Sequence, residues 1–298
     1  MSFVIFGAHT VPYPSSLVAR RFSVAALCAL SSVAANFLCA SAAHAQSSTV
    51  AWYKFAEGIA GTPATAPILD SSGNGLNGMP FSAPVYQSVP VGDSGLGLRF
   101  TGTPQRVFVP DNPLLALTHS LTLEAFIQYT GIVASGEISS EIVFRGDDRG
   151  GYDPYFLTIN TDGKLNFTIN DSANAGISIF SPAAIPIGQF LHVAGTLDDT
   201  TGAMRLFVNG VQVNSTTTAL RPAGSLVSSQ IPGLGIGDVQ SSNYNEGFHG
   251  VISDVRISNI ALSPGQFLNA PVAVPEPGSL ALLVPAALDM VGFLRRRK

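Results

Sequence analysis

Three short apolar runs separated by two turn signals constrain the fold more than any other feature of this sequence. The second turn signal is Asn209-Gly210, a residue pair that tolerates positive φ at both central positions of a two-residue hairpin loop. The first is a polar loop of five residues, 198–202. Together they predict a meander of three antiparallel strands. These strands are expected at Phe190–Leu197, Ala203–Val208 and Val211–Asn214.

Further runs of strand length recur between turn residues. Only 11% of the residues are charged, which disfavours charged amphipathic helices, and helix is expected only as a short turn near Ser263–Phe267. Because a single sheet could not bury the inward rows of so many strands, we predict an all-β sandwich of two sheets. The further strands are expected at Ala51–Phe55, Gly97–Phe100, Arg106–Val109, Ser120–Tyr129, Glu141–Arg145, Phe156–Asn160, Lys164–Asn170 and Gly176–Phe180.

The N-terminal segment has the three parts of an export signal. Arg20-Arg21 precede a weakly charged apolar run, 22–43, which ends in the small-residue pattern Ala43-His44-Ala45. We therefore predict a signal peptide over residues 1–45, cleaved to leave Gln46 as the new N-terminus. A short membrane helix is the alternative, although serine and asparagine inside the run would make it a poor permanent span. Both cysteines lie in this run, so the mature body is expected to contain no thiol.

The C-terminal segment, residues 271–298, also has three parts in order. Pro275-Glu276-Pro277 is followed by a short apolar segment, 280–294, and then by four basic residues, 295–298, which the positive-inside rule places in the cytoplasm. This ending resembles the PEP-CTERM sorting signal of bacteria that make extracellular polysaccharide. The resemblance implies an exosortase-type sorting enzyme as a partner and attachment to the membrane through the apolar segment. An ordinary tail anchor is the alternative.

Two residues make the C-terminal segment a poor permanent anchor. Pro285 interrupts the apolar stretch and Asp289 adds a carboxylate to it, which is costly within a bilayer. Transient retention followed by cleavage near Pro277 suits such a segment better than lasting anchorage. We therefore expect the mature protein at the cell surface or in the extracellular matrix of a bacterium.

The body between the two ends is acidic. Residues 46–275 contain nine Lys and Arg against seventeen Asp and Glu. Such a body would be repelled by phosphate backbones and anionic lipids, so no nucleic-acid partner is expected.

Four motifs occur in the body in the order found in one fold family. Their sequence resembles the laminin-G-like, concanavalin A-like jelly-roll domains, and the resemblance covers roughly residues 49–268. It implies a jelly-roll domain over 46–270, in a family of glucanases, lectins and receptor-binding or adhesive modules. The motifs are Tyr53–Gly58 with Leu69–Gly75, Ser120–Ile127, Phe190–Gly210 and Phe248–Ile257.

The carboxylates do not have the spacing of a hydrolase of this family. Concanavalin A-like glycoside hydrolases place two carboxylates on one strand, in the pattern Glu-x-Asp-x-x-Glu, so that both enter one cleft. The nearest pairs are Glu137 with Glu141 and Asp147 with Asp148, and neither matches. His192 lies in a predicted strand without an acidic partner nearby in the sequence, which indicates a structural histidine. We therefore expect no enzyme activity, with a glycoside hydrolase as the disfavoured alternative.

One loop has the composition of a calcium site. Members of this fold often bind a structural Ca²⁺ through an early loop like Asp70–Gly75, which offers the oxygens of Asp70 and Asn74. Asp254 of the expected last strand could approach them. The alternative is that Asp70 and Asn74 only make hydrogen bonds that shape the turn.

Two other loops combine tyrosine with acidic, amide or basic residues, as sugar-binding surfaces do. The alternative is that these tyrosines cover loop backbone. The composition leaves two roles open: a module that binds extracellular polysaccharide or glycoprotein, and a structural or adhesive surface protein without a specific ligand. The candidate ligand-binding residues are Asp148, Arg149, Tyr152, Tyr155, Tyr244 and Asn245.

Overall fold

A computed structural model describes residues 48–131, 136–241 and 245–270. The predicted signal peptide (1–45), the motif Pro275-Glu276-Pro277 and the apolar segment 280–294 lie outside the described residues. Across the part of the chain that is described, no helix is long and apolar enough to cross a membrane.

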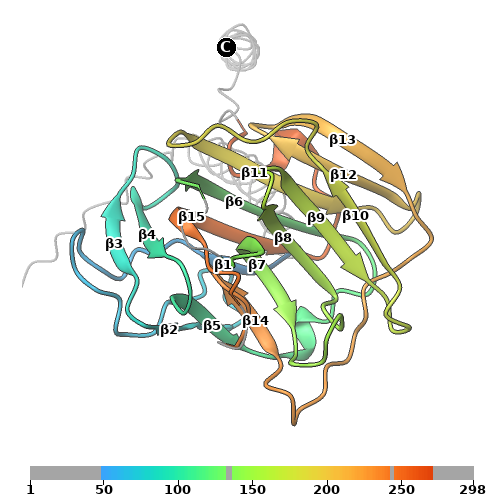
Figure 1. The fold of residues 1–298 in the computed structure, drawn as a ribbon, viewed down its shortest axis with the longest axis horizontal. Coiled ribbons are helices and arrows are strands. Elements are labelled where there is room, and N and C mark those ends of the chain that lie inside the picture. Colours follow the sequence, from blue (N-terminus) through green and yellow to red (C-terminus); the bar gives the residue numbers. More distant parts are fainter. Residues whose placement is uncertain (1–47, 132–135, 242–244, 271–298) are drawn as a thin grey trace, which may run out of the picture. The chain divides into compact units, whose positions relative to one another are not determined.

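The described residues form two antiparallel β-sheets, one of eight strands and one of seven (Figure 1). The eight-stranded sheet has the order β13 (Val211–Thr217), β12 (Ala203–Val208), β11 (Phe190–Leu197), β6 (Leu121–Tyr129), β15 (His249–Ser258), β4 (Leu96–Thr101) and β3 (Val85–Ser88), with β1 (Thr49–Tyr53) also paired to β15. The seven-stranded sheet has the order β10 (Gly176–Phe180), β9 (Leu165–Asn170), β8 (Tyr155–Asn160), β7 (Ser139–Gly146), β14 (Gly233–Ile236), β5 (Arg106–Pro110) and β2 (Met79–Phe81). Two 3₁₀ turns, η1 (Pro113–Leu115) and η2 (Pro264–Gln266), complete the regular structure.

The core lies between the two sheets. Residues that alternate along the strands are fully buried there, for example Leu123 and Ile127 on β6, and Leu157 and Ile159 on β8. Each buried apolar side chain of this size stabilises the fold by about 1.5–3 kcal/mol relative to its exposed state. The all-β, two-sheet prediction is therefore confirmed.

The predicted meander is present as β11, β12 and β13, in consecutive antiparallel pairs. Asn209 and Gly210 between β12 and β13 have φ values of 50° and 77°, as a type I′ turn requires. Three short strands were not predicted: β2, β3 and β14. Each has only three or four residues, and two of the four residues in β14 are glycine, so neither length nor alternation marks them in the sequence.

β15 organises the eight-stranded sheet. On one side it pairs with β6, and on the other its first half pairs with β4 and its second half with β1. The change of partner coincides with a bulge between Ser253 and Arg256, where Asp254 has a φ of 43°.

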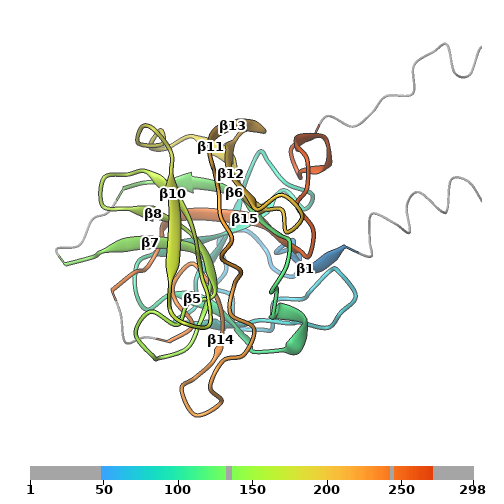
Figure 2. The same cartoon turned by 90° about the vertical axis from the view of Figure 1, so that its right-hand side faces the viewer.

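The segment after β15 packs on the outer face of the eight-stranded sheet (Figure 2). Leu262 and Phe267 form a small buried cluster with Ala194 of β11 and Phe207 of β12. The segment therefore covers the part of this face around Ala194 and Phe207, whereas part of the outer face of the seven-stranded sheet is open to a pocket.

Candidate functional site

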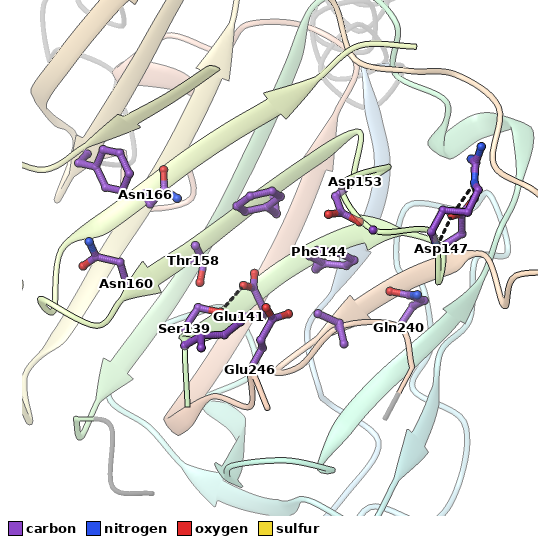
Figure 3. Close-up of a pocket in the computed structure, with 17 residues that line it drawn as sticks. Ser139, Glu141, Phe144, Asp147, Asp153, Thr158, Asn160, Asn166, Gln240 and Glu246 are labelled. Carbon is purple, nitrogen blue, oxygen red and sulfur yellow. Dashed lines mark hydrogen bonds and ion pairs between the residues drawn. The ribbon is translucent and has the colours of Figure 1, made fainter. Parts of the chain in front are cut away.

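The outer face of the seven-stranded sheet carries side chains that alternate with core residues. On β8, Leu157 and Ile159 enter the core, so Thr158 and Asn160 point to the opposite face. A pocket of about 530 Å³, here called the outer-face pocket, lies over this surface (Figure 3). Strands β7 to β10 contribute to its lining Phe144, Phe156, Thr158, Asn160, Asn166 and Phe180.

Three aromatic rings belong to this lining, those of Phe144, Phe156 and Phe180. Phe144 and Phe156 stack with a centroid separation of 5.7 Å and an interplanar angle of 26°. Phe180 on β10 is 39% exposed although it lies in a strand. Asn160 and Asn166 place amide groups beside these rings, so the pocket offers both stacking surfaces and hydrogen-bonding groups.

Two loops wall the pocket at the end of β7. One follows β7, residues 147–153, and the other follows β14 and is described over residues 237–241 and 245–246. The second loop can lie directly on β14 because residue 235 is glycine: a Cβ there would come within 2.2 Å of the carbonyl oxygen of Asp238. The loops are joined where Gln240 Nε2 donates a hydrogen bond to Asp148 Oδ1 over 3.0 Å.

The first loop is held by an ion pair of its own. Arg149 Nε lies 2.9 and 3.0 Å from the two oxygens of Asp147, and its Nη2 donates to Oδ2 over 2.7 Å. The backbone N–H of Val227 also donates to Asp147, and these bonds hold the pKa of Asp147 below its usual value against the opposing effect of desolvation. The guanidinium of Arg149 also lies 3.9 Å from the ring centroid of Tyr152, a cation–π contact.

Glu141 of β7 is a buried carboxyl group in the wall of the pocket. Its side chain is only 3% exposed, and Oε1 accepts a hydrogen bond from Ser139 Oγ over 2.9 Å. Oε2 accepts no hydrogen bond of normal length among the described residues, and the Thr158 hydroxyl donates to the carbonyl oxygen of Ser140. Thr158 nevertheless lies close enough to Glu141 to act, with Ser139, against the rise in its pKa. Desolvation, and next the nearby charge of Glu246, raise the pKa of Glu141 well above its usual value.

Two further carboxyl groups line the pocket. Desolvation raises the pKa of Asp153 to about 7, with the charges of Glu246 and Asp147 adding to the effect. Desolvation also raises the pKa of Glu246. In Figure 3, Glu246 lies next to Glu141, and Asp153 lies farther along the pocket beyond Phe144.

Taken as chemistry, the pocket combines aromatic faces with amide and carboxyl groups. Aromatic rings stack on apolar faces of a ligand, and amide and carboxyl oxygens accept hydrogen bonds from its hydroxyl groups. A saccharide ring presents both of these ligand features, an apolar face and hydroxyl groups. Within the described residues, no group of three or more His, Cys, Asp or Glu side chains is arranged to hold a metal ion.

Residues 101–266 match the family described as the concanavalin A-like lectin/glucanases superfamily. This chain belongs to that superfamily. The match covers more than half of the sequence and includes the outer-face pocket and both of its loops. No curated protein matches the chain by sequence.

Solved structures share the fold of this concanavalin A-like domain. The binding domain of Paraclostridial Mosquitocidal Protein 1 is similar with a TM-score of 0.56 and 14% identity, covering 76% of this chain and 52% of that one. The botulinum neurotoxin serotype D binding domain gives a TM-score of 0.52 and 15% identity, covering 75% and 51%. This chain thus spans about half the length of these two relatives.

A third structure has nearly the same extent as the concanavalin A-like domain. Domain 4 of AbnA, a GH43 extracellular arabinanase from Geobacillus stearothermophilus, was solved in complex with arabinotriose. Its TM-score is 0.51 at 19% identity, and the similarity covers 74% of this chain and 97% of that domain. At this identity the similarity shows a shared fold.

The predicted ligand-binding residues fall into three groups. Asp148, Arg149 and Tyr152 belong to the loop that walls the pocket, and Asn245 is an exposed neighbour of Glu246 in the other loop. Tyr244 lies outside the described residues. The prediction for the sixth residue, Tyr155, is wrong.

Tyr155 does not face a ligand. It is fully buried on the core side of β8, where its hydroxyl donates a hydrogen bond to the carbonyl oxygen of Leu115 over 2.8 Å. The prediction treated Tyr155 as part of a loop, but β8 begins at this residue and turns its ring inward.

The residues missed from the sequence are those on the strands. Glu141 was considered only as half of a pair with Glu137, and Phe144, Phe156 and Asn166 were not considered as ligand contacts. A usable signal is present: within the predicted strands, the aromatic and amide residues recur at every second position between core residues. The strand residues that alternate with the core residues, and so point away from the core, would have identified this part of the pocket lining.

The three residues of the calcium prediction lie in ordinary hydrogen-bonding arrangements. Asp70 Oδ1 accepts from the backbone N–H groups of Trp52 and Ser72, and Oδ2 accepts from Ser72 Oγ and the N–H of Leu76. Asn74 Nδ2 donates to the carbonyl oxygens of residues 49 and 50. Asp70 and Asn74 therefore make the hydrogen bonds that shape the turn, as the alternative expected. Calcium binding stays a prediction.

Asp254 binds the side chain of Trp52, whose backbone N–H donates to Asp70, and a loop residue, Asp93. Its Oδ1 accepts from Trp52 Nε1 over 3.1 Å and its Oδ2 from the N–H of Asp93 over 2.6 Å. Desolvation raises the pKa of Asp254 to about 6, and these two hydrogen bonds partly offset that rise. No hydrogen bond of Asp70 joins it to Asp254 among the described residues.

His192 has an acidic partner that lies far away in the sequence. Its Nε2 lies 2.8 Å from Oε2 of Glu124 on the neighbouring strand β6, and both side chains are buried. Glu124 also binds Arg256 and accepts a hydrogen bond from the N–H of Leu268. This network lies under the segment after β15, on the opposite sheet from the outer-face pocket.

Proposed function

We propose that this chain is an exported, non-catalytic protein that binds carbohydrate or glycoprotein in the extracellular matrix through its outer-face pocket. The pocket itself carries the proposal: it combines the stacked rings of Phe144 and Phe156 with amide groups and with the unpartnered carboxyl oxygen of Glu141. Membership of a lectin and glucanase superfamily supports a saccharide as the ligand. The complex of AbnA domain 4 with arabinotriose is an example of one domain of this fold with a bound saccharide.

The electrostatics of the pocket support binding over hydrolysis. Glycoside hydrolysis needs one carboxylic acid and one carboxylate that is held ionised. The pKa of each of the carboxyl groups Glu141, Asp153 and Glu246 is raised, and none of them has a cationic hydrogen-bond partner among the described residues. Asp147 has a lowered pKa, but its oxygens are occupied by Arg149 and Val227.

A glycoside hydrolase is nevertheless the second candidate, because Glu141 and Glu246 are neighbouring carboxyl groups in one pocket. Release of reducing sugar from a bound polysaccharide, lost in Glu141→Gln, would decide for it. A purely structural or adhesive role is the third candidate, and it would leave the pocket without a ligand.

The two ends of the sequence support delivery outside the cell. Residues 1–45 have the pattern of a signal peptide, and residues 271–298 resemble the PEP-CTERM signal, so the proposed partners include an exosortase-type enzyme and, transiently, the membrane. Mass spectrometry of the mature protein tests this. We expect an N-terminus at Gln46 and no peptide beyond about Gly278; an intact Lys298 on the surface protein would contradict the proposed processing.

Binding is tested with a glycan array that includes the organism's own polysaccharide. We expect the full chain to bind and the variant Phe156→Ala to lose about twofold to tenfold in affinity, as a stacking contribution of about 0.5–1.5 kcal/mol implies. Phe81→Ala is the matched control, because Phe81 is an exposed phenylalanine of the same sheet outside the pocket. Absence of binding to any glycan would overturn the proposal.

A further inference from the structure

The formal charge of the outer-face pocket is strongly one-sided. Its described lining contains four carboxyl groups, those of Glu141, Asp147, Asp153 and Glu246, and one cationic side chain, Arg149. Arg149 already forms an ion pair with Asp147, through three hydrogen bonds of 3.0 Å or less. Three carboxyl groups are therefore left without a cationic partner: a bound cation would stabilise their ionised forms, whereas an anionic ligand would meet no free positive charge in the described lining.

Glu141 adds an observation that points to a ligand group. The residue is 97% buried, given its exposed fraction of 3%, and yet it lines the pocket. Its Oε2 accepts no hydrogen bond within the described residues. Leaving a buried carboxyl oxygen unsatisfied costs about 1–3 kcal/mol, so the position of this oxygen in the wall of a pocket calls for a group that satisfies it.

The ligand group that suits this arrangement is a hydrogen-bond donor with positive charge. An ammonium group has three donors and no acceptor, and hydrogen bonds between charged groups are about twice as strong as neutral ones. A divalent metal ion is the less suitable occupant, because no three acidic or histidine side chains of the described residues converge in the way that a metal ion requires.

We infer that the outer-face pocket selects amino sugars, with the ammonium group bound at Glu141 beside Glu246 and the sugar ring packed against Phe144 and Phe156. This inference rests on the proposed saccharide-binding function and adds the class of sugar. Acidic saccharides, such as uronates, are excluded because Arg149, the one cationic side chain of the described lining, is already bound to Asp147.

Protonation gives the site a second property. Glu141 faces Glu246 and Asp238, and Asp153 faces Glu246 and Asp147, so each is surrounded by like charges. Burial and these charges raise the pKa of Asp153 to about 7. Below that pH the pocket holds protons in place of a cation, and amino-sugar binding becomes weaker.

The test compares three β-1,4-linked trisaccharides by titration calorimetry with the full chain: tri-glucosamine, its fully N-acetylated form and a tri-uronate. We expect tri-glucosamine to bind about tenfold more tightly than the acetylated form near pH 7, in line with one charge-assisted hydrogen bond. The preference should decrease at higher salt and at about pH 5, and the uronate should not bind.

Variants connect the preference to the site. Glu141→Gln should abolish the preference for the amine, and Asp153→Asn should reduce it and provides a second route if Glu141→Gln fails to fold. Asp162→Asn removes an equal charge from an exposed turn outside the pocket and should change nothing.

Equal affinity for the amine and the acetylated sugar, with binding still lost in Phe156→Ala, would overturn this inference and leave the proposed function in place. Absence of binding to all three sugars and to the glycan array would overturn both. Equal binding of the tripeptide Gly-Lys-Gly would show selection of the ammonium group alone and would overturn the assignment to a sugar.

Discussion

Gln240 and Asp148 are hydrogen-bonded across the rim of the outer-face pocket, with 3.0 Å between Nε2 and Oδ1, although they lie 92 positions apart in the sequence. Gln240 is 2% exposed and lines the pocket, and Asp148 belongs to the loop that Arg149 and Asp147 hold in place. The bond therefore fixes the two walls of the pocket relative to each other.

Removing this hydrogen bond should weaken saccharide binding more clearly than it lowers the free energy of unfolding. For Gln240→Ala we predict a loss of about threefold to tenfold in saccharide affinity, because one hydrogen bond contributes about 0.5–1.5 kcal/mol. The free energy of unfolding should decrease by no more than about 1.5 kcal/mol. Gln212→Ala, at an exposed position on β13, is the control. Unchanged affinity in Gln240→Ala would show that the bond does not shape the site.

The pH dependence of stability follows from carboxyl groups whose pKa is raised in the folded state. Desolvation raises the pKa values of Asp153 and Asp238 to about 7. Between about pH 4 and 7 the folded protein thus keeps protons that the unfolded chain has lost, so these groups make the free energy of unfolding fall as pH rises. Urea denaturation at about pH 5 and above pH 7 should show this decrease.

The contribution of each group can be isolated by substitution. Asp153→Asn and Asp238→Asn should each flatten the decrease in unfolding free energy across this pH range, because an amide does not titrate. Asp162→Asn, in an exposed turn, should keep the slope of the unmodified protein. A slope that stays the same in both pocket-side variants would contradict the raised pKa values.

We predict that Asp70 stabilises the fold strongly through its hydrogen bonds alone, with no bound cation. Asp70→Ala leaves the N–H groups of Trp52, Ser72 and Leu76 without their acceptor, and we predict a loss of about 2–4 kcal/mol in unfolding free energy. Asp171→Ala is the matched control, since Asp171 accepts two backbone hydrogen bonds in an ordinary turn. Its loss should be smaller.

Calcium can be tested with the same proteins. If the four hydrogen bonds that Asp70 accepts are its whole role, a chelator will leave the melting temperature unchanged. A higher melting temperature in Ca²⁺, reversed by chelator and absent in Asp70→Asn, would favour the calcium site instead.

Glu124 should control how firmly the segment after β15 is attached. Its fully buried carboxylate binds the buried His192 and the partly buried Arg256 and N–H of Leu268. Removing one member of a buried ionic network costs about 3–5 kcal/mol, and Glu124→Ala should lower stability by that amount. Hydrogen exchange in residues 259–270 should become faster, whereas the exposed Glu57→Ala should change neither quantity much. Unchanged exchange would show that the segment is held by apolar packing alone.

Most of the fold was accessible from the sequence, because its strands alternate strongly and its turns are chemically explicit. The meander from β11 to β13 was predicted from Asn209-Gly210 and the flanking runs, and the φ values of that turn agree. β2, β3 and β14 were missed because three or four residues are too few for alternation to be detected. The positions of β2 and β14 also depend on pairing with strands far away in the sequence, β5 and β7.

The site was accessible only in part. The loop around Asp148 and Arg149 was predicted from its mixed composition, which is a local property. Glu141 could not be recognised in the same way. Its raised pKa depends on burial in the folded protein and on the charge of Glu246, which lies more than 100 positions away in the sequence. Likewise, the pairing of His192 with Glu124 is set by the register between β11 and β6.

The central claim is that saccharides bind over the outer face of the seven-stranded sheet. Photo-crosslinking with a diazirine-bearing oligosaccharide that binds in the glycan array, followed by mass spectrometry of the peptides, tests it most directly. We predict crosslinks within residues 139–160 and 239–246, and their loss in Phe156→Ala but not in Phe81→Ala. Crosslinks confined to the loop of Asp70 or to the eight-stranded sheet would contradict the account.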